Sequence, residues 1–301
     1  MAVPFRLFVV ECTYLTKGVG LMRKVQITKL KTPYVSVEGS YGGNQGWFKP
    51  AEGATGTDSR GLSVRKAKTL EGFGCGLIGG SDIILHLLGR SVLSNGSEKG
   101  YFKVRTEDNL ESGSAISKKE YENYILQMEK KFFHILPKLG ISGVLLALNF
   151  NIYFFLNRKN IRKKTGYSFL ARWGVLPGNI LIRIKEMLSE DIPVIISIGP
   201  GFFHSNKLNF YNKIEKMPDD NKLGTASDAK TYLFKPVTKT KDHYVTVTGV
   251  EEYPTVDGSK IMLEISSWGR KYYVNFAEYL EYVKKNDNFY FSNILYIRKK
   301  W

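Results

Sequence analysis

Cysteine and histidine are both scarce in this chain, and their scarcity narrows the chemistry to consider. The 301 residues include two cysteines, Cys12 and Cys75, and four histidines. Two cysteines cannot build the disulfide framework of a small secreted domain, and at most they form one bridge. No group of residues has the spacing typical of a metal site. The sequence therefore predicts no metal and no cofactor.

Long uninterrupted apolar runs are also missing. The most apolar segment, GVLLALNFNIYFFL at residues 143–156, has 14 residues and includes two asparagines, whereas a membrane-spanning helix needs about 20 apolar residues. The N-terminal stretch MAVPFRLFVVECTY is interrupted by Pro4, Arg6 and Glu11 and shows no small-residue cleavage site. We expect no membrane span, no signal peptide and a cytoplasmic location, with residues 143–156 forming a buried helix.

Acidic side chains are outnumbered by basic ones. The chain has 28 Asp and Glu against 44 Lys and Arg, which gives a net charge of +16 and a pI near 9.6. Such a charge favours anionic partners, among them nucleic acid, anionic lipid, cell-wall polymers and acidic peptides. The basic residues are scattered in short groups, however, and no zinc-finger, helix-turn-helix or arginine–aromatic pattern is present. Solvated basic faces are the favoured interpretation, nucleic acid is not expected, and acidic partners stay open.

Enough apolar residues are present for a packed interior: 43% of the chain is hydrophobic and 13% aromatic. Residues 1–48 alternate like strands in FRLFVV, KVQITKL and YVSVEG, and the polar residues 49–74 predict a long loop. Helices then dominate up to about residue 190, and strands dominate the last hundred residues. This segregation predicts an α+β fold, as one domain over 1–301 with a helical lobe at about 75–190 and a sheet lobe at about 1–48 and 191–301.

Further elements follow from periodicity and capping signals. Ser117 followed by Glu120 forms a capping-box pattern at the start of a helix. The other expected helices lie at 75–88, 143–157, 177–189 and 275–285, the expected strands lie at 193–199, 243–250, 260–268 and 289–299, and residues 200–238 are expected to be irregular.

Cys75 occupies an unusual position, between two glycines at the first turn of the helix CGLIGGSDIILHLL. A thiol at a helix N-terminus lies near unpaired backbone N–H groups, which favour the thiolate and lower the pKa. The same N–H groups can receive a developing oxyanion. Gly79 and Gly80 indicate that another backbone packs closely on this helix. The alternative is that Cys75 is a small buried hydrophobic residue.

A cysteine nucleophile needs a base, and four histidines are candidates. His86 lies eleven residues along the helix from Cys75, about 16 Å away, and is too far. His134 follows two phenylalanines and is interpreted as a packing residue, whereas His204 lies in a loop and stays open. His243 opens a strand, from which its side chain can project toward a cleft.

Three stretches together carry a resemblance: GCG opening a helix, HYVTVTGV at 243–250, and SSWG at 266–269. In this order they resemble the papain-like cysteine peptidase superfamily, and EDIPVIISIG before the histidine strand resembles its bacterial branch that includes double-glycine leader peptidases. The resemblance covers about residues 41–85 and 178–283. It implies a papain-like fold, in which a helical lobe led by the cysteine-bearing helix packs on an antiparallel sheet lobe, and a peptide or amide substrate.

By this resemblance Cys75 is the nucleophile, His243 is the general base, and Ser266 occupies the orienting position. The family has Asn there, or Asp in the bacterial group, and a serine gives weaker support. Trp268 matches the tryptophan that shields the pair from water. The oxyanion-hole glutamine of the family has no counterpart just before the cysteine, so Gln45 in YGGNQGWF is the nearest candidate beside the Cys75 backbone; otherwise Gln45 is an ordinary turn residue.

The register of two strands decides whether Ser266 can reach His243. A two-residue turn at the Asp-Gly pair 257–258 would place Ser266 opposite Gly249, roughly 20 Å from His243. A wider loop would place Ser266 near Val245, on the same face as the histidine. The catalytic interpretation therefore predicts a wide loop.

The sequence thus favours a cysteine-dependent hydrolase, a peptidase or amidase, in which Cys75 attacks a carbonyl and His243 moves the proton. Transfer of the acyl group to an amine would use the same residues. The first alternative is a catalytically weakened papain-like scaffold that acts as a binding protein, which the serine at position 266 favours. The second is a basic polyanion-binding protein, an interpretation that rests on the net charge alone.

Overall fold

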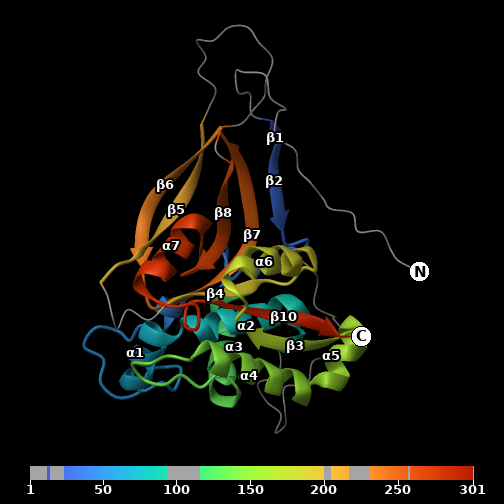
Figure 1. Cartoon of the computed structure of the whole chain (residues 1–301). Coiled ribbons are helices and arrows are strands. Elements are labelled where there is room, and N and C mark those ends of the chain that lie inside the picture. The colour runs from blue at the N-terminus through green and yellow to red at the C-terminus, as the bar shows by residue number, and fades with distance from the viewer. Residues whose placement is uncertain are drawn as a thin grey trace.

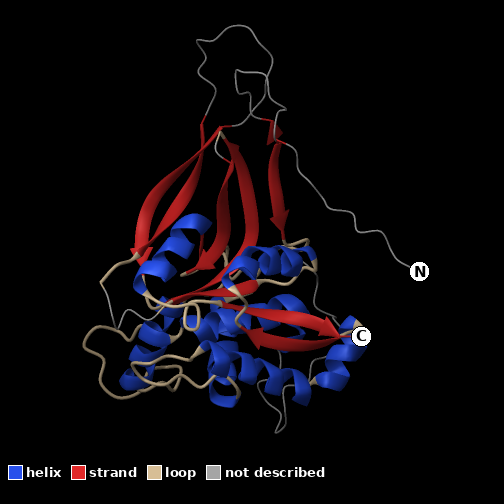
Figure 2. Cartoon of the chain, in the orientation of Figure 1, coloured by secondary structure: helices blue, strands red, loops and turns tan. Residues whose placement is uncertain are grey.

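The computed structural model describes residues 12–13, 24–93, 116–199, 205–216, 231–256 and 258–300. Most helices gather at one end of the molecule, and the long antiparallel strands rise from them (Figures 1 and 2). This arrangement confirms the predicted α+β class.

The described elements have the following bounds. The helices are α1 Val64–Phe73, α2 Cys75–Leu88, α3 Lys118–Lys131, α4 Gly143–Leu156, α5 Arg158–Thr165, α6 Ile180–Ser189 and α7 Phe276–Asn286, with short 3₁₀ helices η1 Gln45–Phe48, η2 Gly89–Val92 and η3 Pro177–Asn179. The strands are β1 Cys12–Thr13, β2 Lys24–Lys29, β3 Ser168–Trp173, β4 Val194–Ile198, β5 Leu208–Lys216, β6 Thr231–Thr240, β7 His243–Thr255, β8 Gly258–Ser267, β9 Arg270–Asn275 and β10 Ile294–Lys300.

The long strand β7 organises the sheet, whose order is β3-β10-β4-β7-β8-β9-β5-β6. One edge of β7 is shared by two strands, since β4 pairs with its first half and β2 with its second half. Both of these pairings are antiparallel. The first residue of β7, His243, lies opposite Ile198 at the end of β4. The sheet therefore places His243 at a strand start that faces the helical layer.

The β7–β8 hairpin is tight, so the prediction of a wide loop was wrong. Thr255 pairs with Gly258, which leaves two residues between the strands, and Asp257 itself lies outside the described residues. The register shifts by one residue between Val247 and Gly249, as it does at a β-bulge. The turn residues are 256 and 257 and not the expected 257 and 258, which moves the partner of Ser266 from Gly249 to Val247. The one-residue shift then moves it to Thr246.

Several local predictions also need correction. Residues 64–73 form helix α1 within the expected loop, because the Ser63 side chain caps the helix and accepts a hydrogen bond from Lys66 N–H, while Ala67 and Leu70 face the core. The segment YVSVEG forms only an isolated bridge, between Val37 and Ile116. FRLFVV lies outside the described residues.

Regular structure is more extensive than predicted in two further places. The expected irregular stretch 200–238 contains β5 and most of β6, which pair with each other. Residues 158–165, which lie outside the expected helices, form α5, and β3 follows it and pairs with β10. The expected helical lobe therefore contributes one strand to the sheet.

Helix α2 is the central element of the core. It packs on β7 and against α3 and α4, and most of its residues are buried. A side chain at Gly76 would meet the ring of Tyr244, and one at Gly79 would meet Thr246. The nearest atoms at Gly79 and Gly80 belong to side chains, so the prediction that another backbone packs closely there was wrong.

Helix α4 differs from the expected buried helix. Its inner face is buried against the core, whereas Val144, Leu148, Ile152 and Phe155 are exposed on its outer face. Throughout the described part of the chain, no helix combines the length and the apolar character that crossing a membrane requires.

Candidate active site

Cys75 is the first residue of α2 and is half-buried at its N-terminus. The preceding Gly74 provides no side-chain cap, so no capping side chain accepts from the first N–H groups of the helix. Backbone N–H groups of Cys75, Gly76 and Tyr244 interact with the thiol. The contact with Tyr244 places the sulfur beside the start of β7.

Burial is the largest influence on the Cys75 thiol, and it raises the pKa above the usual value. The backbone N–H groups of Tyr244, Gly76 and Cys75 favour the thiolate and oppose this shift, while the negative charge of Asp242 adds to it. The net direction is upward, so the lowered pKa expected from the helix N-terminus was wrong. At neutral pH the resting form is the thiol.

His243 is buried at the start of β7, and burial lowers its pKa from 6.5 to about 4. The imidazole is therefore neutral at pH 7 and has a lone pair to accept a proton. Its Nε2 lies 2.8 Å from the Oγ of Ser267. This hydroxyl engages Nε2, and Nδ1 is the second ring nitrogen.

Ser266 points elsewhere. Its hydroxyl donates a hydrogen bond of 2.7 Å to the backbone carbonyl of Tyr41. Successive residues of a strand point to opposite faces, and Ser266 lies opposite Thr246, whose parity differs from that of His243. The structure thus gives the contact with His243 to Ser267, where the sequence had placed Ser266.

Trp268 covers the imidazole. The two rings are stacked, with centroids 4.6 Å apart and an interplanar angle of 20°. Trp268 and Gly269 form the two-residue turn between β8 and β9, and both have positive φ, 50° and 71°. Positive φ is unfavourable for a bulky residue, so this strained turn holds the indole over His243.

Gln45 lies beside the nucleophile. It begins η1, and its Nε2 donates a hydrogen bond of 2.7 Å to the backbone carbonyl of Glu71, near the end of α1. A Cβ on Gly74 would lie 3.6 Å from the Gln45 Cβ. The fold therefore brings Gln45 next to Cys75 across thirty residues of sequence, and one of its two amide hydrogens is already engaged.

One small pocket brings these groups together. It is lined by Gly43, Gln45, Cys75, Ile78, Gly79, Asp82, His243, Tyr244, Thr246, Ser266, Ser267 and Trp268. Its volume of about 20 Å³ is enough for roughly one water molecule. Every residue that the sequence assigned to the site lines this pocket.

Asp82 is a site residue that the sequence analysis missed. It is fully buried, and its carboxylate accepts hydrogen bonds from the Gly43 N–H (2.9 Å) and from the hydroxyls of Tyr121 (2.5 Å) and Tyr34 (3.4 Å). Burial raises the pKa of Asp82 to about 6. The signal was available: Asp82 is the one charged residue among apolar ones in its helix, and it lies two turns from Cys75, on the same face.

The other histidines lie away from this pocket or outside the described residues. The ring of His86 interacts with Asp191, whose backbone carbonyl lies 3.2 Å from Nε2. His134 is exposed and is not the packing residue that was expected, and His204 lies outside the described residues. Within the described ranges, no group of three or more His, Cys, Asp or Glu side chains is placed to bind a metal ion.

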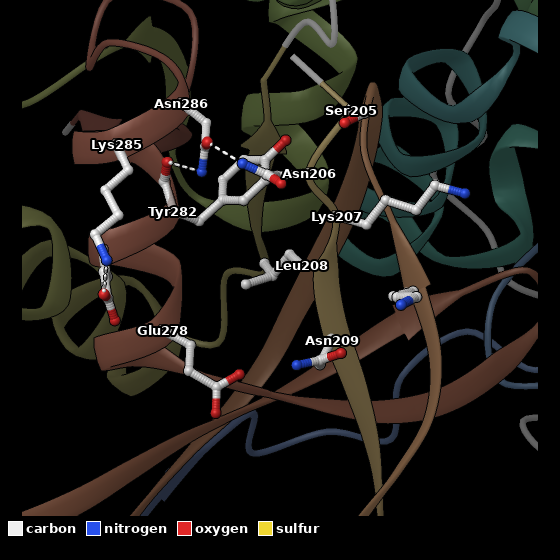
Figure 3. A pocket seen from close by; sticks show the side chains of 11 residues that line it. Ser205, Asn206, Lys207, Leu208, Asn209, Glu278, Tyr282, Lys285 and Asn286 are labelled. Atoms are coloured by element: carbon white, nitrogen blue, oxygen red, sulfur yellow. Dashed lines mark hydrogen bonds and ion pairs between the residues drawn. The ribbon is translucent and has the colours of Figure 1, made fainter.

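A larger, more polar pocket lies between α7 and the neighbouring ends of β5 and β6 (Figure 3). Its volume is about 610 Å³, and its described lining includes neither cysteine nor histidine. Glu278 points into it and accepts a hydrogen bond from the Tyr211 hydroxyl. Leu208 lines it, and Phe210, two residues on, contacts Trp268 with ring centroids 5.7 Å apart. Strand β5 therefore contributes one residue to this pocket and another to the packing around the indole that covers His243.

No protein-family model, curated protein or solved structure matches this chain.

Proposed function

We propose that this protein is a cysteine-dependent hydrolase of peptide or amide bonds, built on a papain-like scaffold. The observation that carries the proposal is that a cysteine at a helix N-terminus and a buried histidine at a strand start line one pocket. The histidine has a hydroxyl partner on one nitrogen and an indole over its face. This set of groups is what nucleophilic catalysis by a thiol needs.

In the proposed reaction, His243 takes the thiol proton on Nδ1 while the Cys75 sulfur attacks the substrate carbonyl carbon. The C–S bond forms, and the π electrons of the carbonyl move to oxygen. The backbone N–H groups at the start of α2, with the second amide hydrogen of Gln45, stabilise this oxyanion. The intermediate collapses to a thioester, and the leaving amine takes the proton from His243.

Hydrolysis then reverses the proton movements. A water molecule attacks the thioester carbon and gives a proton to His243. The C–S bond breaks, the carboxylic acid leaves, and the Cys75 sulfur recovers the proton. Both groups are neutral at rest, so proton transfer accompanies each attack and does not precede it. We place the reaction in the cytoplasm, on a peptide or amide substrate, and expect no nucleic-acid partner.

A second candidate function is a binding protein on the same scaffold. Two observations favour it: burial raises the pKa of the Cys75 thiol, and the imidazole is supported by a serine in place of an amide or carboxylate. In this case a peptide would bind over the mouth of the pocket and would not be cleaved.

Labelling with iodoacetamide separates the two functions. In a Cys12→Ser background Cys75 is the only thiol, so mass spectrometry reports its alkylation alone. For a hydrolase, His243→Gln should slow alkylation at neutral pH by at least about tenfold, because the base is lost. The same variant should abolish cleavage of fluorogenic peptide amides by the unlabelled protein. A thiol that reacts equally in both proteins, with no cleavage of any substrate, would support the binding protein.

A further inference from the structure

The outer face of α4 carries a continuous apolar stripe. Val144, Leu148, Ile152 and Phe155 are spaced by four, four and three residues, so they share one face of the helix. They are largely exposed, to 53% for Leu148 and 64% for Phe155. Exposed apolar patches of this kind mark interaction surfaces.

Positive charge adjoins this stripe without any negative charge nearby in the sequence. Between Glu129 and Glu186 the chain has eleven Lys and Arg residues and no Asp or Glu. Helix α5 follows α4 after one residue, and both lie at the lower edge of the molecule in Figure 1. The exposed basic side chains of α5 are Arg158, Lys159, Arg162 and Lys163.

The apolar and basic parts are in contact. The guanidinium of Arg158 lies 4.9 Å from the ring centroid of Phe155. A hollow of about 340 Å³ opens between the end of α4 and the start of α5, lined by residues 155–160. The two helices therefore present one amphipathic surface.

We propose that the α4–α5 surface docks on an anionic lipid membrane. Large apolar side chains next to Lys and Arg suit the boundary between acyl chains and negatively charged headgroups. With 14 residues, α4 is too short to span the bilayer and would lie in its plane. This proposal does not depend on the proposed catalytic activity.

The charge distribution favours a lipid surface over a second copy of the chain. A symmetric contact through α4 would bring two α5 helices near each other, and each is basic with no acidic residue to pair across the interface. Anionic headgroups would instead neutralise this charge. The membrane is therefore the occupant that complements both halves of the surface.

Sedimentation with lipid vesicles tests the proposal. The full chain should bind vesicles that contain phosphatidylglycerol, bind less as salt is raised, and stay in solution with phosphatidylcholine alone. Two double variants should each weaken binding at least about tenfold: Leu148→Ser with Phe155→Ser, and Arg162→Glu with Lys163→Glu. Val256→Ser is the matched control, since Val256 is 93% exposed at the tip of the β7–β8 hairpin, and it should bind like the parent protein.

Three results would overturn the assignment. One is failure of the parent protein to bind phosphatidylglycerol vesicles. Another is unchanged binding by either double variant, with circular dichroism showing that it is folded. The third is a dimer in light scattering that Leu148→Ser with Phe155→Ser dissociates, because the stripe would then bind a second copy.

Discussion

Ser267 and His243 are hydrogen-bond partners, with 2.8 Å between Oγ and Nε2. The hydroxyl belongs to the residue directly before the strained Trp268 turn, and the same turn places the indole over the ring. A hydroxyl both donates and accepts, whereas an amide oxygen or a carboxylate only accepts. Ser267 therefore holds the ring in place but fixes its tautomer less strictly than an acceptor-only side chain would.

Replacement of either serine should separate their roles. Ser267→Ala should lower the alkylation rate of Cys75, or kcat/KM for a cleaved peptide, by at least about tenfold, because the imidazole loses its orienting partner. Ser266→Ala should mainly lower the free energy of unfolding, by about 1 kcal/mol, because it removes the hydrogen bond to the Tyr41 carbonyl. Rates and urea unfolding of both variants provide the measurement.

The conservative variant Ser267→Asn is the control for this pair. Its amide oxygen can accept from Nε2–H and leave the lone pair on Nδ1, so the rate should equal or exceed that of the parent. Equal losses of rate in Ser266→Ala and Ser267→Ala would contradict the assignment of the orienting role to Ser267.

His243 should make the protein less stable as pH falls from 6.5 to 4. The pKa of His243 is lowered on folding. Between about pH 4 and 6.5 the imidazole is therefore protonated in the unfolded chain and neutral in the folded chain. The stability difference between the parent and His243→Gln should therefore grow in favour of the parent by about 3 kcal/mol as pH rises from 4 to 6.5. Urea unfolding at several pH values measures it, and a difference that does not vary with pH would contradict burial of the imidazole.

Asp82 should act in the opposite direction over nearly the same range. Its pKa is raised from 3.8 to about 6 on folding, so the folded chain binds the proton more tightly and stability falls as pH rises through this window. Asp82→Asn has no carboxyl group to titrate, so it does not lose stability in this way. Its free energy of unfolding should therefore rise relative to that of the parent by about 3 kcal/mol between pH 3.8 and 6.

Asp82→Ala is the companion variant. It leaves the Gly43 N–H and the Tyr121 hydroxyl without their acceptor, so it should destabilise the protein by about 2 to 4 kcal/mol at pH 5. Urea unfolding measures both variants, and an Asp82→Ala protein as stable as the parent at pH 5 would show that the Asp82 side chain does not hold Gly43 and Tyr121.

Much of the fold was predictable from short-range signals. The Ser117 side chain accepts a hydrogen bond from the Glu120 N–H, as the capping pattern predicted, and α2 runs over the predicted residues Cys75–Leu88. The candidate nucleophile and base were predicted from the same kind of local signal, because Cys75 is the first residue of a helix and His243 the first residue of a strand. Such local patterns depend only on neighbours in the chain.

The remainder depended on contacts that neighbours in the chain do not reveal. The one-residue shift after Val247 decides that Ser267 shares a face with His243, and a bulge of this kind has no signature in the residues themselves. Burial raises the pKa of the Cys75 thiol, whereas the N–H groups at the helix N-terminus lower it. The effect of burial is the larger of the two. The outer face of α4 is apolar yet exposed, so apolar composition alone predicted burial incorrectly.

Gly76 in α2 and Gly72 in α1 offer a matched test of whether the packing of α2 on β7 positions the Cys75 sulfur. A Cβ at Gly76 would lie 2.6 Å from Ile141 Cγ2 and 3.2 Å from the Tyr244 ring, whereas one at Gly72 in α1 meets no atom within 4 Å. Gly76→Ala should therefore cost about 1 to 3 kcal/mol of unfolding free energy and slow alkylation of Cys75, because overpacking pushes α2 away from β7. Gly72→Ala should stabilise the protein by about 0.5 to 1 kcal/mol through helix propensity and leave the alkylation rate unchanged. If Gly76→Ala is as stable and as reactive as the parent, the close approach of α2 to Tyr244 does not position the sulfur.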